Sequence, residues 1–119
     1  MRYSPKTDLL AFNRDAGGNE RWQIFVSDEK GESIRNYSQN PDNVHNFGQW
    51  STDGKAFSFS SNTLERHRLD VYRQDTNNSG PELVYAGVDS SEPIAWVNNN
   101  QIIVVREGPR SDTSQLLAI

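Results

Sequence analysis

The sequence of 119 residues contains no cysteine, which excludes disulfides, thiolate metal sites and a cysteine nucleophile. Positive charge is scarce: 12 Lys and Arg against 16 Asp and Glu give a net charge of −4. That balance argues against a nucleic-acid partner or an anionic membrane surface. No apolar run approaches the roughly 18 residues of a membrane span. The start, "MRYSPKTDLLAF", has no apolar leader, and its absence favours a cytoplasmic location, although the missing cysteines leave the compartment open.

Hydrophobic residues are also few. They make up 34% of the chain, and adding its 8 glycines leaves the share below the roughly 45–50% of ordinary globular domains. Three Trp, four Tyr and five Phe nevertheless supply large apolar groups for a core. The length allows at most one domain of ordinary size.

The stretch "GQWSTDGKAFSFSSN", residues 48–62, has the pattern of a strand, a turn and a second strand. Asp53-Gly54 supplies the positive-φ backbone that a tight hairpin needs. Phe57 and Phe59 alternate with serines, so they share one face of a strand. Because a lone hairpin is only marginally stable in water, this one is expected to belong to a larger structure.

The layout of an aromatic, a polar turn and an apolar strand recurs along the chain. It is found in Tyr3–Phe12, Trp50–Phe59 and Trp96–Val105. The leading aromatics are 47 and 46 residues apart, and "QIFVSD" at Gln23 precedes "DVYRQD" at Asp70 by 47. Repeats of four short strands with this period are typical of β-propeller blades.

We therefore predict an all-β fold of about two and a half four-stranded antiparallel blades, a partial β-propeller. Blade one covers about 3–46, blade two about 47–92 and an incomplete blade three about 93–119, with no catalytic domain. A β-sandwich or meander with coincidental spacing is the alternative.

The alternation also predicts strands and core. Strands are expected near Leu9–Asn13, Trp22–Val26, Phe47–Trp50, Lys55–Ser60, Leu69–Arg73 and Ile102–Arg106, with short outer strands near Ser33–Asn36 and Glu82–Tyr85. The residues expected between adjacent sheets are Phe12, Ile24, Phe57, Phe59, Val71, Ile103 and Val105, with Trp50 and Trp96 in equivalent places.

Closed propellers have four to eight blades. We therefore expect partners that cover the free ends: missing blades of a parent chain, or further copies of this chain in a homo-oligomer. The C-terminal "SQLLAI", residues 114–119, is expected to offer an unpaired strand edge.

The residues resemble a known family. "WSTDGKAFSFSSN" (50–62) with "LDVYRQD" (69–75) is similar to the repeat of Tol-system propeller proteins and of the N-terminal propellers of prolyl oligopeptidase-family serine peptidases. "RDAGGNERWQIFVSD" (14–28) and "VHNFGQW" (44–50) look closer to the aminopeptidase and acylaminoacyl-peptidase branch. The match is weaker elsewhere: Thr52 replaces the usual Pro, Thr7-Asp8 replaces Asp-Gly, and "WVNNNQI" lacks the turn.

In that family the chemistry resides in a separate α/β-hydrolase domain whose Ser lies on G-x-S-x-G. The only G-x-S here, Gly31-Glu32-Ser33, lacks the second Gly. The resemblance therefore implies a non-catalytic gating or docking segment for such a domain, which meets peptide substrates only through the parent enzyme. Two alternatives stay open: a Tol-type protein-binding scaffold without an enzyme, or a fragment whose copies assemble into a ring.

Candidate binding residues follow from blade topology, because the b–c and d–a connections of successive strands a to d emerge at the same end. The charged b–c loops 14–20, 62–68 and 107–114, with the d–a segment 40–46, would form one polar rim. The rim residues are Arg14, Glu20, His45, Arg66, His67, Arg68 and Arg110. The alternative is that these charges only keep the domain soluble.

No metal or cofactor is expected. "DTNNSG" (75–80) imitates half of a calcium loop, but Ala86 stands where the bidentate Glu belongs. His45 and His67, the only histidines, are too few for a zinc site. The sequons at Asn36 and Asn77 are interpreted as turn and edge residues.

Overall fold

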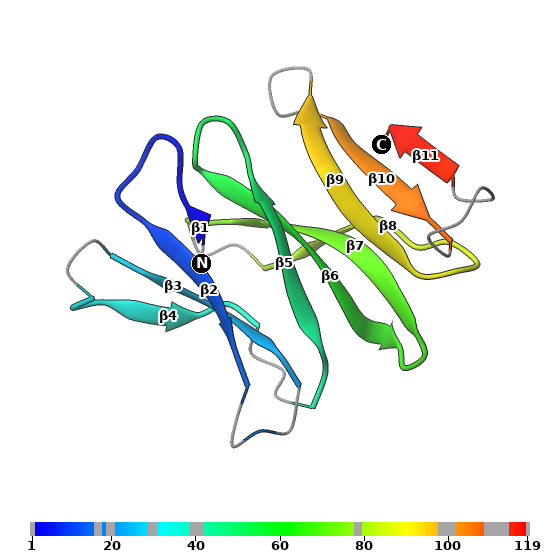
Figure 1. The fold of residues 1–119 in the computed structure, drawn as a ribbon, viewed down its shortest axis with the longest axis horizontal. Helices are drawn as coiled ribbons and strands as arrows, with labels where there is room; N and C mark the ends of the chain where they lie inside the picture. Colours follow the sequence, from blue (N-terminus) through cyan, green and yellow to red (C-terminus); the bar gives the residue numbers. More distant parts are fainter. Residues whose placement is uncertain are drawn as a thin grey trace.

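The structure, a computed structural model, describes residues 2–15, 18, 21–28, 31–38, 42–77, 80–97, 102–108 and 115–118. All regular elements in these ranges are β-strands. They form three antiparallel sheets that stand side by side, each with its strands in chain order (Figure 1). The predicted all-β fold of propeller blades is confirmed, with two four-stranded sheets and one three-stranded sheet.

We name the sheets blade one, blade two and blade three in chain order. Blade one contains β1 (Arg2–Tyr3), β2 (Leu10–Arg14), β3 (Gln23–Ser27) and β4 (Ile34–Asn36). Blade two contains β5 (His45–Trp50), β6 (Ala56–Glu65), β7 (Arg68–Asp75) and β8 (Glu82–Tyr85). Blade three contains β9 (Ser91–Val97), β10 (Ile102–Glu107) and β11 (Gln115–Ala118). Every strand expected from the sequence overlaps one of these.

The turn between β5 and β6 shows why the sequence folds locally as it does. Asp53 Oδ1 accepts hydrogen bonds from the Ser51 hydroxyl at 2.7 Å and the Lys55 amide at 3.0 Å. These bonds, that from Ser51 foremost, hold the pKa of the Asp53 carboxyl below its ordinary value. Gly54 has a φ of 73°, a conformation that side chains disfavour. The hairpin is therefore fixed by its own four turn residues.

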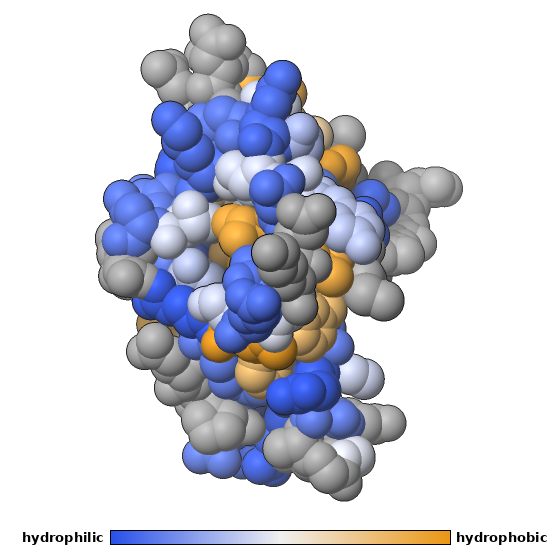
Figure 2. Space-filling view, turned by 90° about the vertical axis from the view of Figure 1, so that its left-hand side faces the viewer, coloured by the Kyte–Doolittle hydropathy of each residue, from blue (hydrophilic) through white to orange (hydrophobic). Residues whose placement is uncertain are grey.

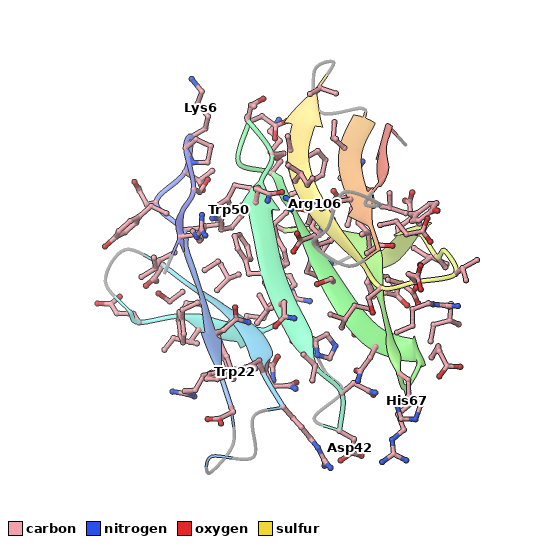
Figure 3. All side chains as sticks on the ribbon, turned by 45° about the vertical axis from the view of Figure 1, so that its right-hand side comes forward. Lys6, Trp22, Asp42, Trp50, His67 and Arg106 are labelled. Atoms are coloured by element: carbon pink, nitrogen blue, oxygen red, sulfur yellow. The ribbon has the colours of Figure 1, made fainter. Side chains whose placement is uncertain are left out.

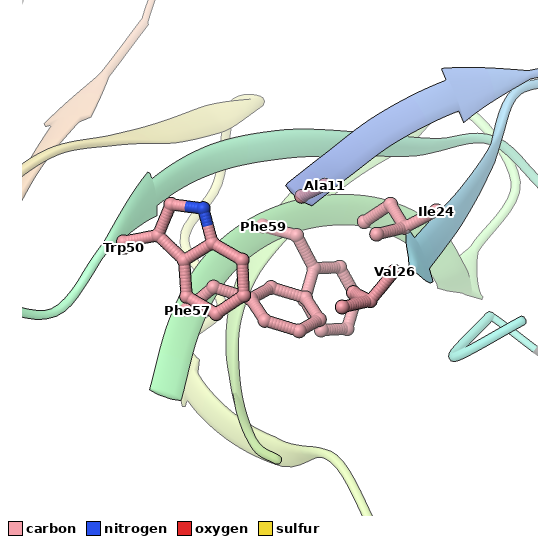
Figure 4. Packing of buried hydrophobic residues seen from close by; sticks show 6 residues of the cluster. All are labelled: Ala11, Ile24, Val26, Trp50, Phe57 and Phe59. Carbon is pink, nitrogen blue, oxygen red and sulfur yellow. The ribbon is translucent and has the colours of Figure 1, made fainter. Parts of the chain in front are cut away.

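Adjacent blades pack through faces of different composition. Between blades one and two, Trp50, Phe57 and Phe59 of blade two pack against aliphatic side chains of blade one (Figure 4). Those aliphatic residues are Ala11, Ile24 and Val26. Each blade thus presents a leading face toward the next blade in the chain and a trailing face toward the preceding one.

The second junction repeats the first. Its cluster is formed by Ala56 and Val71 from blade two with Trp96, Ile103 and Val105 from blade three. The predicted core positions that these two clusters confirm are Ile24, Trp50, Phe57, Phe59, Val71, Trp96, Ile103 and Val105.

Phe12 is the exception, and its prediction as an inter-sheet residue was wrong. It is only partly buried and belongs to neither cluster. Its ring stacks on Phe25 at 5.6 Å, as Phe59 stacks on Tyr72 at 5.3 Å. Phe12 therefore occupies the repeat position of Phe59, but on the trailing face of blade one, which faces away from blade two.

A hydrogen bond from an indole also repeats at both junctions. Trp50 Nε1 donates to the carbonyl of Arg2 at 2.9 Å, and Trp96 Nε1 donates to the carbonyl of Gln49 at 3.0 Å. In each case the first strand of one blade is bonded to the first strand of the blade before it. This bond satisfies the polar end of an otherwise buried ring.

Candidate functional site

Two of the connections predicted to form a rim lie at the same end of the blades. Asp42, from the segment between blades one and two, and His67, from the turn between β6 and β7, are at this end, whereas Lys6 is at the opposite end (Figure 3). The rim contains a cavity of about 540 Å³ at the junction of blades one and two, which we call the rim groove. Its lining residues are Arg21, Asp42, Asn43, Val44, Asn62, Thr63, Arg66 and His67.

Asn62 links the two walls of the rim groove. Its Oδ1 accepts a hydrogen bond from the Val44 amide at 2.9 Å, and its carbonyl accepts one from Asn43 Nδ2 at 3.4 Å. Its own Nδ2 donates to the carbonyl of Arg66 at 3.2 Å. Asn62 thus fixes the segment before β5 against the β6–β7 turn. Sequence analysis assigned Asn62 no role, because the residues around it in the chain do not indicate its hydrogen bonds with Asn43 and Val44, 19 and 18 positions away.

The charge of the rim groove is mostly positive. Arg21 Nη1 lies 3.7 Å from Asp42 Oδ1, and the two side chains are 53% and 86% exposed. An ion pair this exposed contributes little to stability. Arg66 and His67 are also exposed. Two guanidinium groups thus accompany one carboxylate among the lining residues, an arrangement suited to an acidic ligand.

The b–c loop predicted over 62–68 is mostly strand, which corrects the sequence interpretation. β6 continues to Glu65 and β7 begins at Arg68, so only Arg66 and His67 form the turn. The pair Glu65↔Arg68 closes this hairpin beyond a register shift that starts at Ser61. The turn therefore projects on a two-stranded arm rather than on a free loop.

His45 does not reach the rim surface. Its side chain is buried, with Nδ1 3.2 Å from the carbonyl of Asn43 and the ring 6.0 Å from that of Phe59. Burial lowers its pKa, so the imidazole is neutral in the folded protein at neutral pH. Its role is packing at the junction of blades one and two.

The other rim candidates do not join the rim groove. Arg68 pairs through Nε with Asp70 Oδ1 at 2.7 Å, a hydrogen bond that raises the pKa of its guanidinium. Asp70 is fully buried, so this contact satisfies a carboxylate inside the blade. Arg14 lies 4.7 Å over the Phe25 ring on the trailing face of blade one. Glu20 and Arg110 lie outside the described residues.

A second cavity, of about 470 Å³, occurs at the junction of blades two and three. Arg106 and Glu92, 3.5 Å apart, are on its wall. Nearby, Glu107 accepts hydrogen bonds from the Tyr85 hydroxyl and the Val88 amide, both at 2.7 Å. These bonds, that of Tyr85 first, lower the pKa of Glu107. The carboxylate is thereby committed to holding the connection between β8 and β9.

The residues that imitated metal and modification motifs have structural contacts. Asp75 pairs with Arg73 at 3.2 Å, while Asn78 and Ser79 lie outside the described residues. The Ser38 hydroxyl accepts a hydrogen bond from the Ile24 amide at 2.7 Å. Within the described ranges, no group of three or more His, Asp or Glu could hold a metal ion, and no helix there could cross a membrane.

The sheets and their repeated junctions define β-propeller architecture. Among solved structures, TolB from Acinetobacter baumannii is similar, with a TM-score of 0.71 and 17% identity over 98% of this chain. At this identity the likeness shows the fold alone, a TolB-like β-propeller. The chain spans 28% of the TolB chain. No family model and no curated protein matches the sequence.

Proposed function

We propose that this chain is a non-catalytic, protein-binding β-propeller segment whose rim groove takes an extended acidic segment of a partner. The observation that carries the proposal is the groove itself, at the blade end where connections converge. Hydrogen bonds of Asn62 join its walls, and rigid sheets that display such connections are a common basis for binding. Charge complementarity to Arg21 and Arg66 selects an acidic partner.

The test is selection from a random peptide library displayed on phage, against the immobilised chain. We expect the enriched peptides to be acidic. Arg66→Glu reverses one charge of the rim groove, and Lys6→Glu makes the same change at the opposite end. We expect Arg66→Glu to weaken binding about tenfold or more, about 1.4 kcal/mol, and Lys6→Glu to leave it unchanged. Basic peptides, or equal binding by both variants, would contradict the proposal.

The purified chain is also expected to be catalytically silent. Nucleophilic catalysis needs a nucleophile and a base within hydrogen-bond reach. Of the two histidines, His45 contacts a backbone carbonyl, and His67 is exposed on a turn. Peptide anilides and nitrophenyl esters are the substrates to assay after repeated purification. Turnover that a single Ser→Ala change removed would overturn the expectation.

A second candidate is a gating or docking segment for an α/β-hydrolase domain of a peptidase. It is favoured by the sequences of residues 14–28 and 50–62, which resemble those of the prolyl oligopeptidase family. The reading frame beyond Ile119 distinguishes the candidates. An α/β-hydrolase segment with G-x-S-x-G would support docking, whereas further blades alone would support a scaffold without an enzyme.

A further inference from the structure

The trailing face of blade one is a mainly aromatic and apolar surface on which no described sheet packs. Its residues are Tyr3, Leu10, Phe12 and Phe25, on one face because Tyr3 pairs with Leu10 and Phe12 pairs with Phe25 across the strands. The Arg14 guanidinium lies 4.7 Å from the centroid of the Phe25 ring. Tyr3 is 76% exposed. Figure 2, viewed from the side of blade one, shows hydrophobic residues gathered in the middle of a hydrophilic surround.

The repeat indicates what this face is shaped to contact. The equivalent face of blade two presents Trp50, Phe57 and Phe59, and it packs on the small and β-branched side chains of the preceding sheet. The stacked pair Phe12–Phe25 matches the stacked pair Phe59–Tyr72 in distance and in plane angle, 13° against 11°. The complement of this face is therefore a sheet face of Ala, Val or Ile.

The chain carries such a face at its other end. Ile103 and Val105 point toward blade two, so Val104 between them points to the leading face of blade three. Ala95 pairs with Val104 across the sheet. Val97 lies on the same face by alternation and is 41% exposed. The two faces, on which no described sheet packs, thus have the complementary compositions found at the junction of blades one and two.

We propose that two copies of this chain associate head to tail, with the leading face of blade three of one copy docked on the trailing face of blade one of the other. Such a contact joins two different surfaces, so it continues the blade series from one copy to the next and allows a ring to close. The proposal is independent of the rim groove, which lies at an end of the blades rather than on these faces. It also differs from strand addition at β11, the mode expected from the sequence.

The experiment is size-exclusion chromatography with light scattering on the whole chain, compared with three variants. Phe12→Lys disables the trailing face of blade one, and Val104→Lys disables the leading face of blade three. Val88→Lys, at a residue 91% exposed in the β8–β9 connection, is the matched control. We expect the wild-type chain and Val88→Lys to exceed the monomer mass of 13.5 kDa, and each of the other two variants to run as a monomer.

Mixing the two monomeric variants tests directly whether the two faces bind each other. Phe12→Lys keeps a working leading face and Val104→Lys keeps a working trailing face, so their mixture should form a one-to-one dimer. Misfolded variants could not recover in this way. The proposal would be overturned if the wild-type chain were monomeric or if the mixture stayed monomeric. It would also be overturned if association survived either substitution, as association through strand addition would.

Discussion

Phe57 is the residue on which the junction between blades one and two depends most. Its ring is fully buried and lies 5.3 Å from Phe47 and 5.6 Å from both Trp50 and Tyr37. The contacts with Trp50 and Tyr37 are edge-to-face, a favourable geometry for aromatic rings. A cavity left by shortening this side chain could not close easily, because the three neighbouring rings are held by β5 and by the connection after β4.

Phe57→Ala should therefore lower the free energy of unfolding by about 3–5 kcal/mol. The measurement is the midpoint and slope of urea unfolding, with Val88→Ala as an exposed apolar control that should change little. A midpoint close to that of the wild-type chain would mean that Phe57 is not in the core and that the strand register is wrong by one residue.

His45 makes stability depend on pH in a defined direction. Burial lowers its folded-state pKa, while the unfolded chain titrates near the ordinary value of about 6.5. The unfolded state then binds more protons, so stability is full above that value and falls as the pH drops through about 6.5 toward the folded-state pKa.

The check is urea unfolding from about pH 8 to pH 5 for the wild-type chain and for His45→Gln. The wild-type chain should lose stability relative to the variant over this interval, since carboxylates contribute similarly to both. Parallel pH curves for the two proteins would contradict a buried neutral imidazole.

At the residue scale, alternation predicted the cores around Phe57 and Val71 correctly, because the strand period alone decides which side chains share a face. It failed for Phe12, since a repeat position does not state whether a neighbouring sheet is present. Blade topology, in turn, placed His45 on the rim because it lies in the segment that connects blades one and two. As the first residue of β5, His45 instead points into the junction.

Among the elements, β5 depends on a close approach that only glycine permits. A Cβ on Gly48 would lie 2.6 Å from both Pro93 Cγ of blade three and Ser58 Oγ of the adjacent strand. β5 also shifts register against β6 between Phe47 and Trp50, next to this glycine. Blade two and blade three are therefore held closer at Gly48 than a side chain would allow.

Gly48→Ala should destabilise the chain by about 1–3 kcal/mol, the usual cost of overpacking. Gly80→Ala is the matched control, because a Cβ there meets nothing within 4 Å. Thermal unfolding followed by circular dichroism compares the two variants. Equal melting temperatures would show that the sheets separate enough at Gly48 to admit a methyl group.

The elements themselves were largely predictable. Polar turns such as Ser51–Lys55 and the alternating strands after them marked the boundaries to within a few residues. The arm that carries Arg66 and His67 was not predictable, because the mostly polar sequence of residues 62–65 favours a loop. Within that range the strand register pairs Glu65 with Arg68, beyond a shift that starts at Ser61. The same reason hid the bridging role of Asn62 in the rim groove.

For the whole molecule, the account rests on junctions that repeat. In blades two and three, a tryptophan from the first strand packs over the preceding blade, and its indole N–H donates to a carbonyl there. The two junctions use the same residue type at equivalent positions, Trp50 and Trp96, although their remaining side chains differ. Junctions of this kind join the sheets that carry the rim groove and the trailing face of blade one.

Hydrogen exchange of the three tryptophan indole N–H groups, followed by NMR, tests this central claim most directly. Trp50 and Trp96 are 8% exposed and bonded to the preceding blade, whereas Trp22 is 39% exposed. We predict that the indoles of Trp50 and Trp96 exchange far more slowly than that of Trp22, because their exchange requires opening of a blade junction. Exchange of Trp50 and Trp96 as fast as that of Trp22 would contradict the packing of these blades.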